Sequence, residues 1–166
     1  MTAKVQAVEP APGVGELLAG SQFADAYRVR VDSADLDATR AAQLMFSRQP
    51  GWVDGLMRVR DAIVGPLGLK TAHHAPHKQL KTIGMFPIQS ATPGRVVLGF
   101  DDKHQDFRVA VDVVQVSGGC EVTATTLVRR HNLFGLIYLT TILPFHRLIV
   151  RATLRNMASH ISDNLS

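Results

Sequence analysis

Residues 132–161 read NLFGLIYLTTILPFHRLIVRATLRNMASHI and hold both the longest apolar run and the longest helical pattern of the chain. From Leu133 to Leu143 the residues are apolar almost all round, a pattern typical of a helix that is buried on every side. After Pro144 the apolar residues recur at i, i+4, i+7 and i+11, which predicts one buried helical face formed by Val150, Leu154, Met157 and Ile161. The stretch therefore predicts a long core helix around which the rest of the fold is organised.

The same stretch bears on the shape of the helix and on membrane insertion. Pro144 has no amide hydrogen and clashes with the preceding turn, so we expect it to kink the helix or to begin a new one. About eleven apolar positions precede Pro144, whereas a membrane span needs ~20 residues. We therefore expect no transmembrane segment.

Composition narrows the class of protein. The 166 residues, of which 46% are hydrophobic and 19% are charged, are enough to bury a substantial core. The single cysteine, Cys120, excludes an internal disulfide and any metal cluster held by cysteines. Residues 1–20 contain no apolar segment of signal-peptide length. These features predict a cytoplasmic protein.

The positive charge gathers at one end of the chain. The formal net charge is +4, and residues 122–162 contain five arginines but no Asp, Glu or Lys. This basic and apolar end favours an acidic ligand, an anionic membrane surface, or pairing with acidic side chains elsewhere in the fold. We expect no nucleic-acid partner, because the arginines are few and no recognised nucleic-acid-binding motif accompanies them.

The first half of the chain predicts an arm, a strand and two helices. Residues 1–20 are aperiodic and contain Pro and Gly, so we expect a flexible N-terminal arm ahead of one domain over 21–162. Residues 22–31 alternate between apolar and polar and predict a half-buried strand, weakened only by Asp25 on its apolar side. Two helices should follow, at about 35–48 and 52–64.

Both helices carry further signals. Asp32 or Ser33 is expected to cap the first helix, with Asp35 and Asp37 in its first turn. The second helix carries an apolar stripe made of Trp52, Leu56, Val59 and Ile63.

Residues 81–131 have the periodicity of strands joined by short turns. Pro87 makes residues 82–90 an edge or bulged strand. Short turns require antiparallel hairpins, so these strands form a meander, and the long helix after it must cover one face of a curved sheet. The predicted fold is therefore α+β in the helix-grip arrangement: one strand, two short helices, four to six antiparallel strands and one long C-terminal helix.

Three segments carry a resemblance: PGWVDGLMRVRDAIVGPLGLK (50–70), LGFDDKHQDFRVAV (98–111) and HNLFGLIYLTTILPFHRLIV (131–150). On these segments the chain resembles a bacterial family of unknown function in the START and Bet v 1-like (SRPBCC) superfamily, over roughly residues 15–158. The resemblance implies a cavity for an apolar or aromatic ligand. Relatives in that superfamily include lipid carriers, hormone receptors, polyketide cyclases and aromatases, so it does not fix the function.

Four residues are the first candidates for a ligand site. Tyr138 is a polar group in the most apolar helical segment, and its hydroxyl needs a partner. His146 falls on the helical face that should meet the sheet, as a tether or as a ligand contact. Arg108 and Asp112 lie on the face of their strand opposite Phe107. If that face is concave they could contact a ligand carboxylate, and otherwise they form a salt-bridge network.

Other polar residues are weaker candidates. Asp102 and His104 either stabilise a turn or lie at a cavity mouth. The linker over residues 70–79 carries three histidines, which we expect to lie on a surface loop rather than to bind a metal. Cys120 has no evident activating base and is not expected to be a nucleophile. No cofactor and no metal are expected, and no catalytic residue can be named.

Three hypotheses remain for the function. The favoured one is binding of a small hydrophobic or lipid-like ligand in a cavity between the long helix and the sheet, roughly a few hundred Å³ in volume. The second is a cyclase-, aromatase- or isomerase-like enzyme that uses the same cavity, although no catalytic motif is present. The third is a non-catalytic interaction protein, either peripheral to an anionic membrane or dimeric through the apolar run 133–143.

Overall fold

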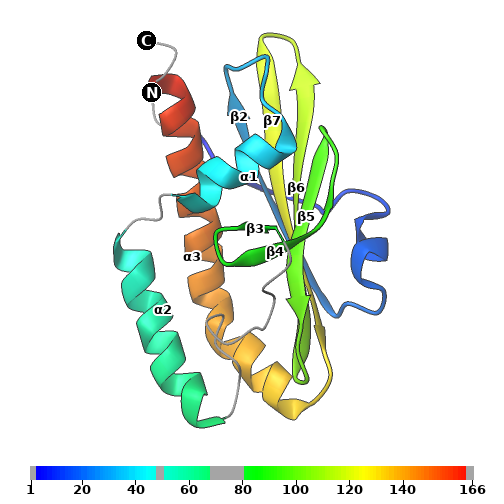
Figure 1. The fold of residues 1–166 in the computed structure, drawn as a ribbon, viewed down its shortest axis with the longest axis vertical. Coiled ribbons are helices and arrows are strands. Elements are labelled where there is room, and N and C mark those ends of the chain that lie inside the picture. The colour runs from blue at the N-terminus through cyan, green and yellow to red at the C-terminus, as the bar shows by residue number, and fades with distance from the viewer. Residues whose placement is uncertain (1–2, 48–50, 68–80, 164–166) are drawn as a thin grey trace.

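The computed structural model describes residues 3–47, 51–67 and 81–163 (Figure 1). Within these residues a seven-stranded antiparallel sheet, in the order β1-β2-β7-β6-β5-β4-β3, curves around the helices. The elements are, in chain order, β1 (Gln6–Val8), η1 (Val14–Leu18), β2 (Phe23–Val31), α1 (Ala38–Ser47), α2 (Gly51–Val64), η2 (Gly65–Leu67), β3 (Thr82–Ile83), β4 (Phe86–Ala91), β5 (Arg95–Asp101), β6 (Gln105–Val116), β7 (Gly119–Arg130) and α3 (Leu133–Asp163). The predicted α+β helix-grip arrangement is confirmed.

The sheet is a meander from β4 to β7, to which β2 adds on the far side. Each strand of the meander pairs antiparallel with the next, as the short turns require. β2 pairs antiparallel with β7, which places Asp25 opposite Thr126. The register between β4 and β5 shifts between Ile88 and Ser90, and Pro87 lies in β4. The predicted bulge is therefore confirmed, whereas the single strand expected over 82–90 is divided into β3 and β4, which pair antiparallel.

Alternation along β6 decides which face of the sheet is concave. Val109 and Val111 belong to the same core cluster as Leu154 and Met157 of α3, so their face lies toward the helices. Because successive side chains point to opposite faces of a strand, the residues between them lie on the convex face. Periodicity alone could not make this choice, since Ala110 on the convex face is also fully buried.

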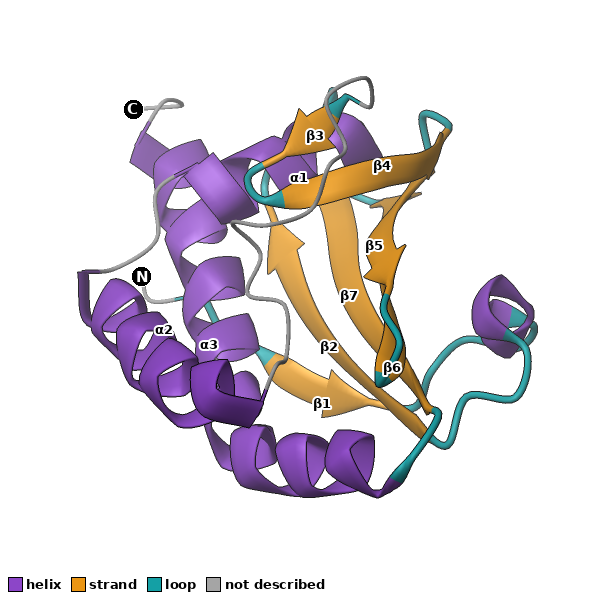
Figure 2. Cartoon of the chain, turned by 60° about the horizontal axis from the view of Figure 1, so that its bottom comes forward, coloured by secondary structure: helices purple, strands orange, loops and turns teal. Residues whose placement is uncertain are grey.

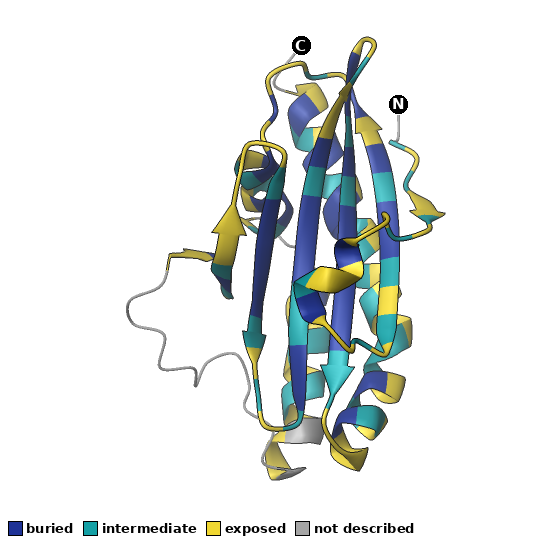
Figure 3. Ribbon diagram, turned by 90° about the vertical axis from the view of Figure 1, so that its right-hand side faces the viewer, coloured by how far each residue is buried: buried dark blue, intermediate teal, exposed yellow. Residues whose placement is uncertain are grey.

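The N-terminal segment, expected as a flexible arm, contributes two elements to the fold. β1 pairs antiparallel with β2 at the edge of the sheet. η1 lies across the convex face (Figure 3), where Val14 is buried in a small cluster with Val97 and Ala110. This segment thus supplies the apolar cover that the convex face of the central strands needs.

The first helix begins later than expected. α1 starts at Ala38, and the backbone N–H of Arg40 donates to Oδ1 of Asp37 at 2.7 Å. Asp37 is therefore the N-cap, which corrects the expectation that Asp32 or Ser33 would cap the helix. The buried face of α1 consists mostly of alanine, which lets the helix approach the sheet closely.

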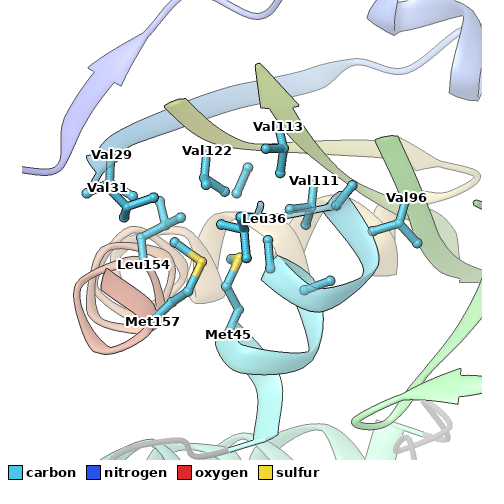
Figure 4. Packing of buried hydrophobic residues seen from close by; sticks show 14 of the residues in the cluster. Val29, Val31, Leu36, Met45, Val96, Val111, Val113, Val122, Leu154 and Met157 are labelled. Atoms are coloured by element: carbon cyan, nitrogen blue, oxygen red, sulfur yellow. The ribbon is translucent and has the colours of Figure 1, made fainter. Parts of the chain in front are cut away.

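The main core lies between the concave face, α1 and the C-terminal half of α3 (Figure 4). Valines of the central strands meet Met45 of α1 and the pair Leu154 and Met157 of α3, and all three of these side chains are at most 1% exposed. Full burial of a side chain of this size contributes about 1.5–3 kcal/mol. The predicted buried face of residues 150–161 is confirmed.

The N-terminal half of α3 departs from the prediction. Leu133, Ile137 and Leu148 are each more than half exposed, so a helix buried on every side is wrong for this part. By length and composition α3 could also cross a membrane, since its most apolar 18-residue window has a mean hydropathy of 1.7 and is only 6% buried. Pro144 lies inside the continuous helix, whose N-terminal part runs at an angle to the rest (Figures 1 and 2).

The apolar stripe predicted for α2 does not face the core either. Trp52 and Val59 are 46% and 55% exposed, whereas Val53, outside the stripe, is buried. α2 lies along α3 rather than on the sheet (Figure 2), so a different side of the helix turns inward. Helical periodicity predicted that α2 is a helix, but its packing against α3 determined which side of α2 is buried.

Asp106 forms a buried charge cluster beside the end of β7. Its Oδ2 accepts a hydrogen bond from Nε of Arg129 at 2.9 Å and lies 3.0 Å from Nε2 of His131. Burial by itself would raise the pKa of Asp106, but the hydrogen bonds and charges of His131 and Arg129 outweigh it, and the pKa is lowered. A lowered carboxyl pKa stabilises the fold above the unfolded value of ~3.9, and this contribution is lost as pH falls toward the folded value.

We therefore expect Asp106→Asn to reduce the free energy of unfolding by about 1–3 kcal/mol at pH 7. The deficit relative to wild type should shrink as pH falls below about 4, because the wild-type carboxylate is then protonated as well. Urea unfolding of both proteins at pH 7 and pH 3 measures the effect. Glu121→Gln, which removes the exposed ion pair with Arg28, is the control and should lose less than about 1 kcal/mol. An equal deficit for Asp106→Asn at both pH values would contradict the electrostatic explanation.

Candidate functional site

A groove lies between the concave face of the sheet, α2 and the N-terminal half of α3. It consists of three adjoining pockets with volumes of about 70, 160 and 90 Å³. Met57 of α2 and Ile149 of α3 line all three, so the pockets lie side by side. The largest of them lies between the long helix and the sheet, with α2 as an additional wall.

The walls are mainly aliphatic and aromatic. Phe86, Phe100 and Phe107, on three neighbouring strands, form an aromatic floor with ring centroids 5.6–6.4 Å apart. These separations are typical of favourable aromatic pairs. The largest pocket is lined by Phe23, Met57, Arg60, Met85, Phe86, Phe100, Asp102, Gln105, Phe107, Thr126, Val128, Tyr138, Leu139, Ile142, His146 and Ile149.

A His–Asp pair joins α3 to β2 at the wall of the groove. Nε2 of His146 lies 3.1 Å from Oδ1 of Asp25, and each side chain is 17% exposed. The ring of Phe23 meets the imidazole edge to face, with centroids 6.1 Å apart. Among the described residues, Oδ2 of Asp25 is buried and has no hydrogen-bond partner. The pair fixes the imidazole where it lines the largest pocket.

Tyr138 lines the groove from the same helix as His146, about two turns closer to its N-terminus. Burial raises the pKa of its hydroxyl, and the nearby Arg60 guanidinium offsets this only in part. The hydroxyl therefore stays protonated at neutral pH and can donate a hydrogen bond. Arg60 itself pairs with Asp61, with Nη2 and Oδ1 2.7 Å apart. Arg60 of α2 is thus the hydrogen-bond partner of Tyr138, and its own positive charge is paired with Asp61.

Gln105 and Asp102 also line the largest pocket. In the described part of the chain, Oε1 of Gln105 is buried and accepts no hydrogen bond. Such an atom loses its hydration without compensation unless a ligand or water supplies a donor. Asp102 accepts a hydrogen bond from the backbone N–H of the next residue, Lys103, at 2.6 Å, in the turn between β5 and β6.

His104 does not line the largest pocket but contacts Asn132, the residue before α3. Its Nδ1 lies 3.0 Å from Nδ2 of Asn132, while Oδ1 of Asn132 accepts from the backbone N–H of Gly135 at 3.0 Å. Asn132 is therefore the N-cap of α3. A Cβ on Gly135 would clash with the carbonyl oxygen of His104, so only glycine lets this turn approach the helix so closely.

Arg108 and Asp112 lie on the convex face, away from the groove. Nη1 of Arg108 pairs with Oδ1 of Asp101 at 2.7 Å, and Asp112 pairs with Arg95 at 2.5 Å. The structure thus gives both residues the salt-bridge environment that was the alternative to contact with a ligand. They could contact the ligand only if their face were concave, and it is not.

Several groove residues were missed by sequence reasoning. Asp25 carried a signal, a lone acid on the apolar face of a strand, but it was interpreted only as a weakness of that strand. Gln105 and Thr126 carried none, because a polar residue beside a turn or within a strand is usually exposed. Met57 and Arg60 lie outside the predicted stripe of α2, of which Leu56 and Val59 line the smallest pocket, so periodicity indicated only part of the helix side that faces the groove.

The remaining candidates of the sequence lie elsewhere. Cys120 is buried in the core, and burial raises the pKa of its thiol. The histidine linker over residues 70–79 lies outside the described residues. Among the residues that the structure does describe, no group of three or more His, Cys, Asp or Glu side chains is arranged to hold a metal ion.

One comparison with known proteins identifies a family, and none names an activity. A family described as a protein of unknown function, DUF2867, matches residues 17–153. A structural-genomics crystal structure of a protein from Rhodobacter sphaeroides is similar at a TM-score of 0.48 and 12% identity, covering 96% of this chain and 99% of that one. No curated protein matches the sequence significantly.

Proposed function

The chain belongs to the DUF2867 family of proteins of unknown function, and we propose that it binds a small apolar ligand in the groove between α3, α2 and the sheet. The observation that carries the proposal is a group of three adjoining pockets between an aromatic floor and an aliphatic helix face. A well-packed core leaves few voids larger than a water molecule, so apolar pockets gathered in one place favour an occupant.

The polar groups of the groove support a more specific ligand. They are few, and they include one buried carbonyl oxygen without a donor, Oε1 of Gln105. Tyr138 and His146 line the same pocket on the α3 side. We infer an apolar molecule, aromatic or lipid-like, that carries a hydroxyl or another hydrogen-bond donor. The helix-grip order of elements also supports a place for the family among START and Bet v 1-like (SRPBCC) proteins.

Binding is tested with N-phenyl-1-naphthylamine, a neutral probe that fluoresces in apolar surroundings. We expect Ile142→Trp, which fills the groove from α3, to weaken probe binding at least tenfold. Thr140→Trp adds the same indole to an exposed position of the same helix, outside all three pockets, and should leave binding unchanged. Equal affinities of the two variants would place the probe elsewhere and contradict the proposal.

A second comparison tests the polar recognition. We expect 1-naphthol to displace the probe better than naphthalene, by a factor of about five if one hydrogen bond is gained. Gln105→Leu should abolish this preference while naphthalene still competes. Native mass spectra of the freshly purified protein, followed by solvent extraction, would reveal a resident ligand. A clean apo mass together with no probe binding would remove the proposal.

The His146–Asp25 pair favours a second candidate, an enzyme of the cyclase or isomerase kind. An imidazole held by a carboxylate at 3.1 Å and facing an apolar pocket is a suitable general acid or base. Incubation of the extracted ligand or of 1-naphthol analogues, followed by mass spectrometry, would detect turnover. His146→Gln should then abolish turnover while probe binding persists. Turnover that survives in His146→Gln would exclude this role.

A further inference from the structure

The outward face of the N-terminal half of α3 is apolar and uncovered. Leu133, Phe134, Ile137, Phe145 and Leu148 are between 42% and 68% exposed. Their spacing places them on neighbouring rows of one helix side, opposite the side that packs on the sheet. Contiguous exposed residues of this size are rare on monomers without an interaction surface.

The threonine hydroxyls on this face are already hydrogen-bonded within the helix. Oγ1 of Thr140 donates to the carbonyl of Leu136, and Oγ1 of Thr141 donates to the carbonyl of Ile137, both at 2.8 Å. Each hydroxyl is thus satisfied within the helix, which leaves a methyl group as its outward surface. The exposed face can therefore enter an apolar medium at low cost.

Three arginines lie on the same side of the helix, toward its C-terminal end. Arg147, Arg151 and Arg155 are exposed, and no carboxylate of the described residues lies within ion-pair distance of them. Arg151 lies over the ring of Tyr27, 5.2 Å from its centroid. Arginines of the sheet, such as Arg28 and Arg108, are paired with acidic side chains instead.

The apolar residues and the arginines together favour a membrane surface over two alternatives, which are a second copy of the chain and a helix that spans the membrane. A second copy of the chain would bring like-charged arginine rows together, and residues 122–162 contain no acidic residue to oppose them. A membrane span would strip the other side of the helix from the sheet, where Leu154 and Met157 are fully buried and His146 pairs with Asp25. An anionic bilayer complements both halves of the face without disturbing the core.

We propose that the exposed side of α3 docks on an anionic phospholipid bilayer. The apolar part, from Leu133 to Leu148, enters the boundary between headgroups and acyl chains, and Arg147 and Arg155 contact lipid phosphates. Tyr27 orients Arg151 toward the same surface. The inference does not rest on the ligand proposed for the groove, although Ile137 and Phe145 of the docking face also line the smallest of the three pockets.

Cosedimentation of the full chain with 100 nm vesicles tests the proposal. We expect binding to phosphatidylcholine vesicles that contain 30% phosphatidylserine, weak binding to pure phosphatidylcholine, and loss of the difference in 0.5 M NaCl. Arg147→Gln with Arg155→Gln should weaken binding roughly 20- to 30-fold, at about 1 kcal/mol per arginine. Arg40→Gln with Lys81→Gln removes the same charge from exposed positions outside α3 and should have little effect.

A second pair of variants tests the apolar half. Leu133→Gln with Leu148→Gln should weaken vesicle binding by at least tenfold while the urea unfolding midpoint stays near that of wild type, since both residues are exposed and line none of the three pockets. Equal binding to neutral and anionic vesicles, or equal losses for the two charge variants, would overturn the proposal. The proposal would also be overturned if wild type failed to bind vesicles and formed a dimer in sedimentation velocity that the double glutamine variant of the apolar half dissociates. Resistance to extraction at pH 11 would indicate a span and also overturn it.

Discussion

Gly99→Ala is expected to destabilise the fold strongly, with a loss of about 3–5 kcal/mol in the free energy of unfolding. Gly99 lies in β5 opposite Arg108 of β6, with a φ of 152°, which L side chains rarely adopt. A Cβ there would clash with the carbonyl oxygen of Phe107 and would lie 3.0 Å from Cα of Arg108. Two independent costs, backbone strain and overlap with a neighbouring backbone, therefore add.

The neighbour cannot move aside cheaply. Nη1 of Arg108 donates to the carbonyl oxygens of Phe107 at 2.9 Å and Phe100 at 3.2 Å, and it pairs with Asp101. The arginine side chain thus crosses Gly99 to reach its partners, and it is only 13% exposed. The total stability of a domain is typically about 5–15 kcal/mol, so the expected loss is a large fraction of it.

Circular dichroism and urea unfolding measure this loss. Gly94→Ala is the matched control, because a Cβ at Gly94 would meet only the carbonyl oxygen of Val113 at an ordinary 3.8 Å. We expect that variant to stay within about 1 kcal/mol of wild type. If Gly99→Ala kept the wild-type unfolding midpoint, the close approach of β5 to β6 at this residue would be refuted.

The second large effect concerns the pair that ties α3 to the sheet. His146→Leu is expected to cost about 3 kcal/mol, because it leaves the carboxylate of Asp25 between helix and sheet without its partner. Oδ2 of Asp25 is already buried without a hydrogen bond from the described residues, so the carboxylate has no second donor to replace the imidazole. An unpaired buried charge is costlier than the loss of one attractive contact.

A double-mutant cycle separates these contributions. Asp25→Leu combined with His146→Leu removes both partners of the contact and should recover most of the stability lost in His146→Leu alone. His160→Leu, on the same helix but outside the groove, is the control and should change stability by less than about 1 kcal/mol. Urea unfolding of the four proteins of the cycle gives the coupling free energy. A double variant no more stable than His146→Leu would show that the two groups are not coupled.

Part of the site could be predicted from the sequence because its residues break a strong pattern. Tyr138 and His146 stand out as polar groups in an otherwise apolar helix, and both line the groove. Arg108 and Asp112 break no pattern, since both faces of β6 carry apolar residues. Their place depended on which face of the sheet the helices cover. Gln105 is conspicuous only because the fold buries it without a hydrogen-bond partner, which no local pattern could indicate.

The sequence by itself determined the order of elements, the antiparallel meander and the buried face of residues 150–161. Each of these follows from the alternation or helical spacing of neighbouring residues, or from the length of a turn, which are local properties. The tertiary structure decided which faces are covered. The segment 133–148 is as apolar as a core helix, yet its outer side is bare because no element of the described chain lies against it. Hydrophobicity states what a side chain prefers, whereas burial requires a second surface, and that surface comes from distant parts of the chain.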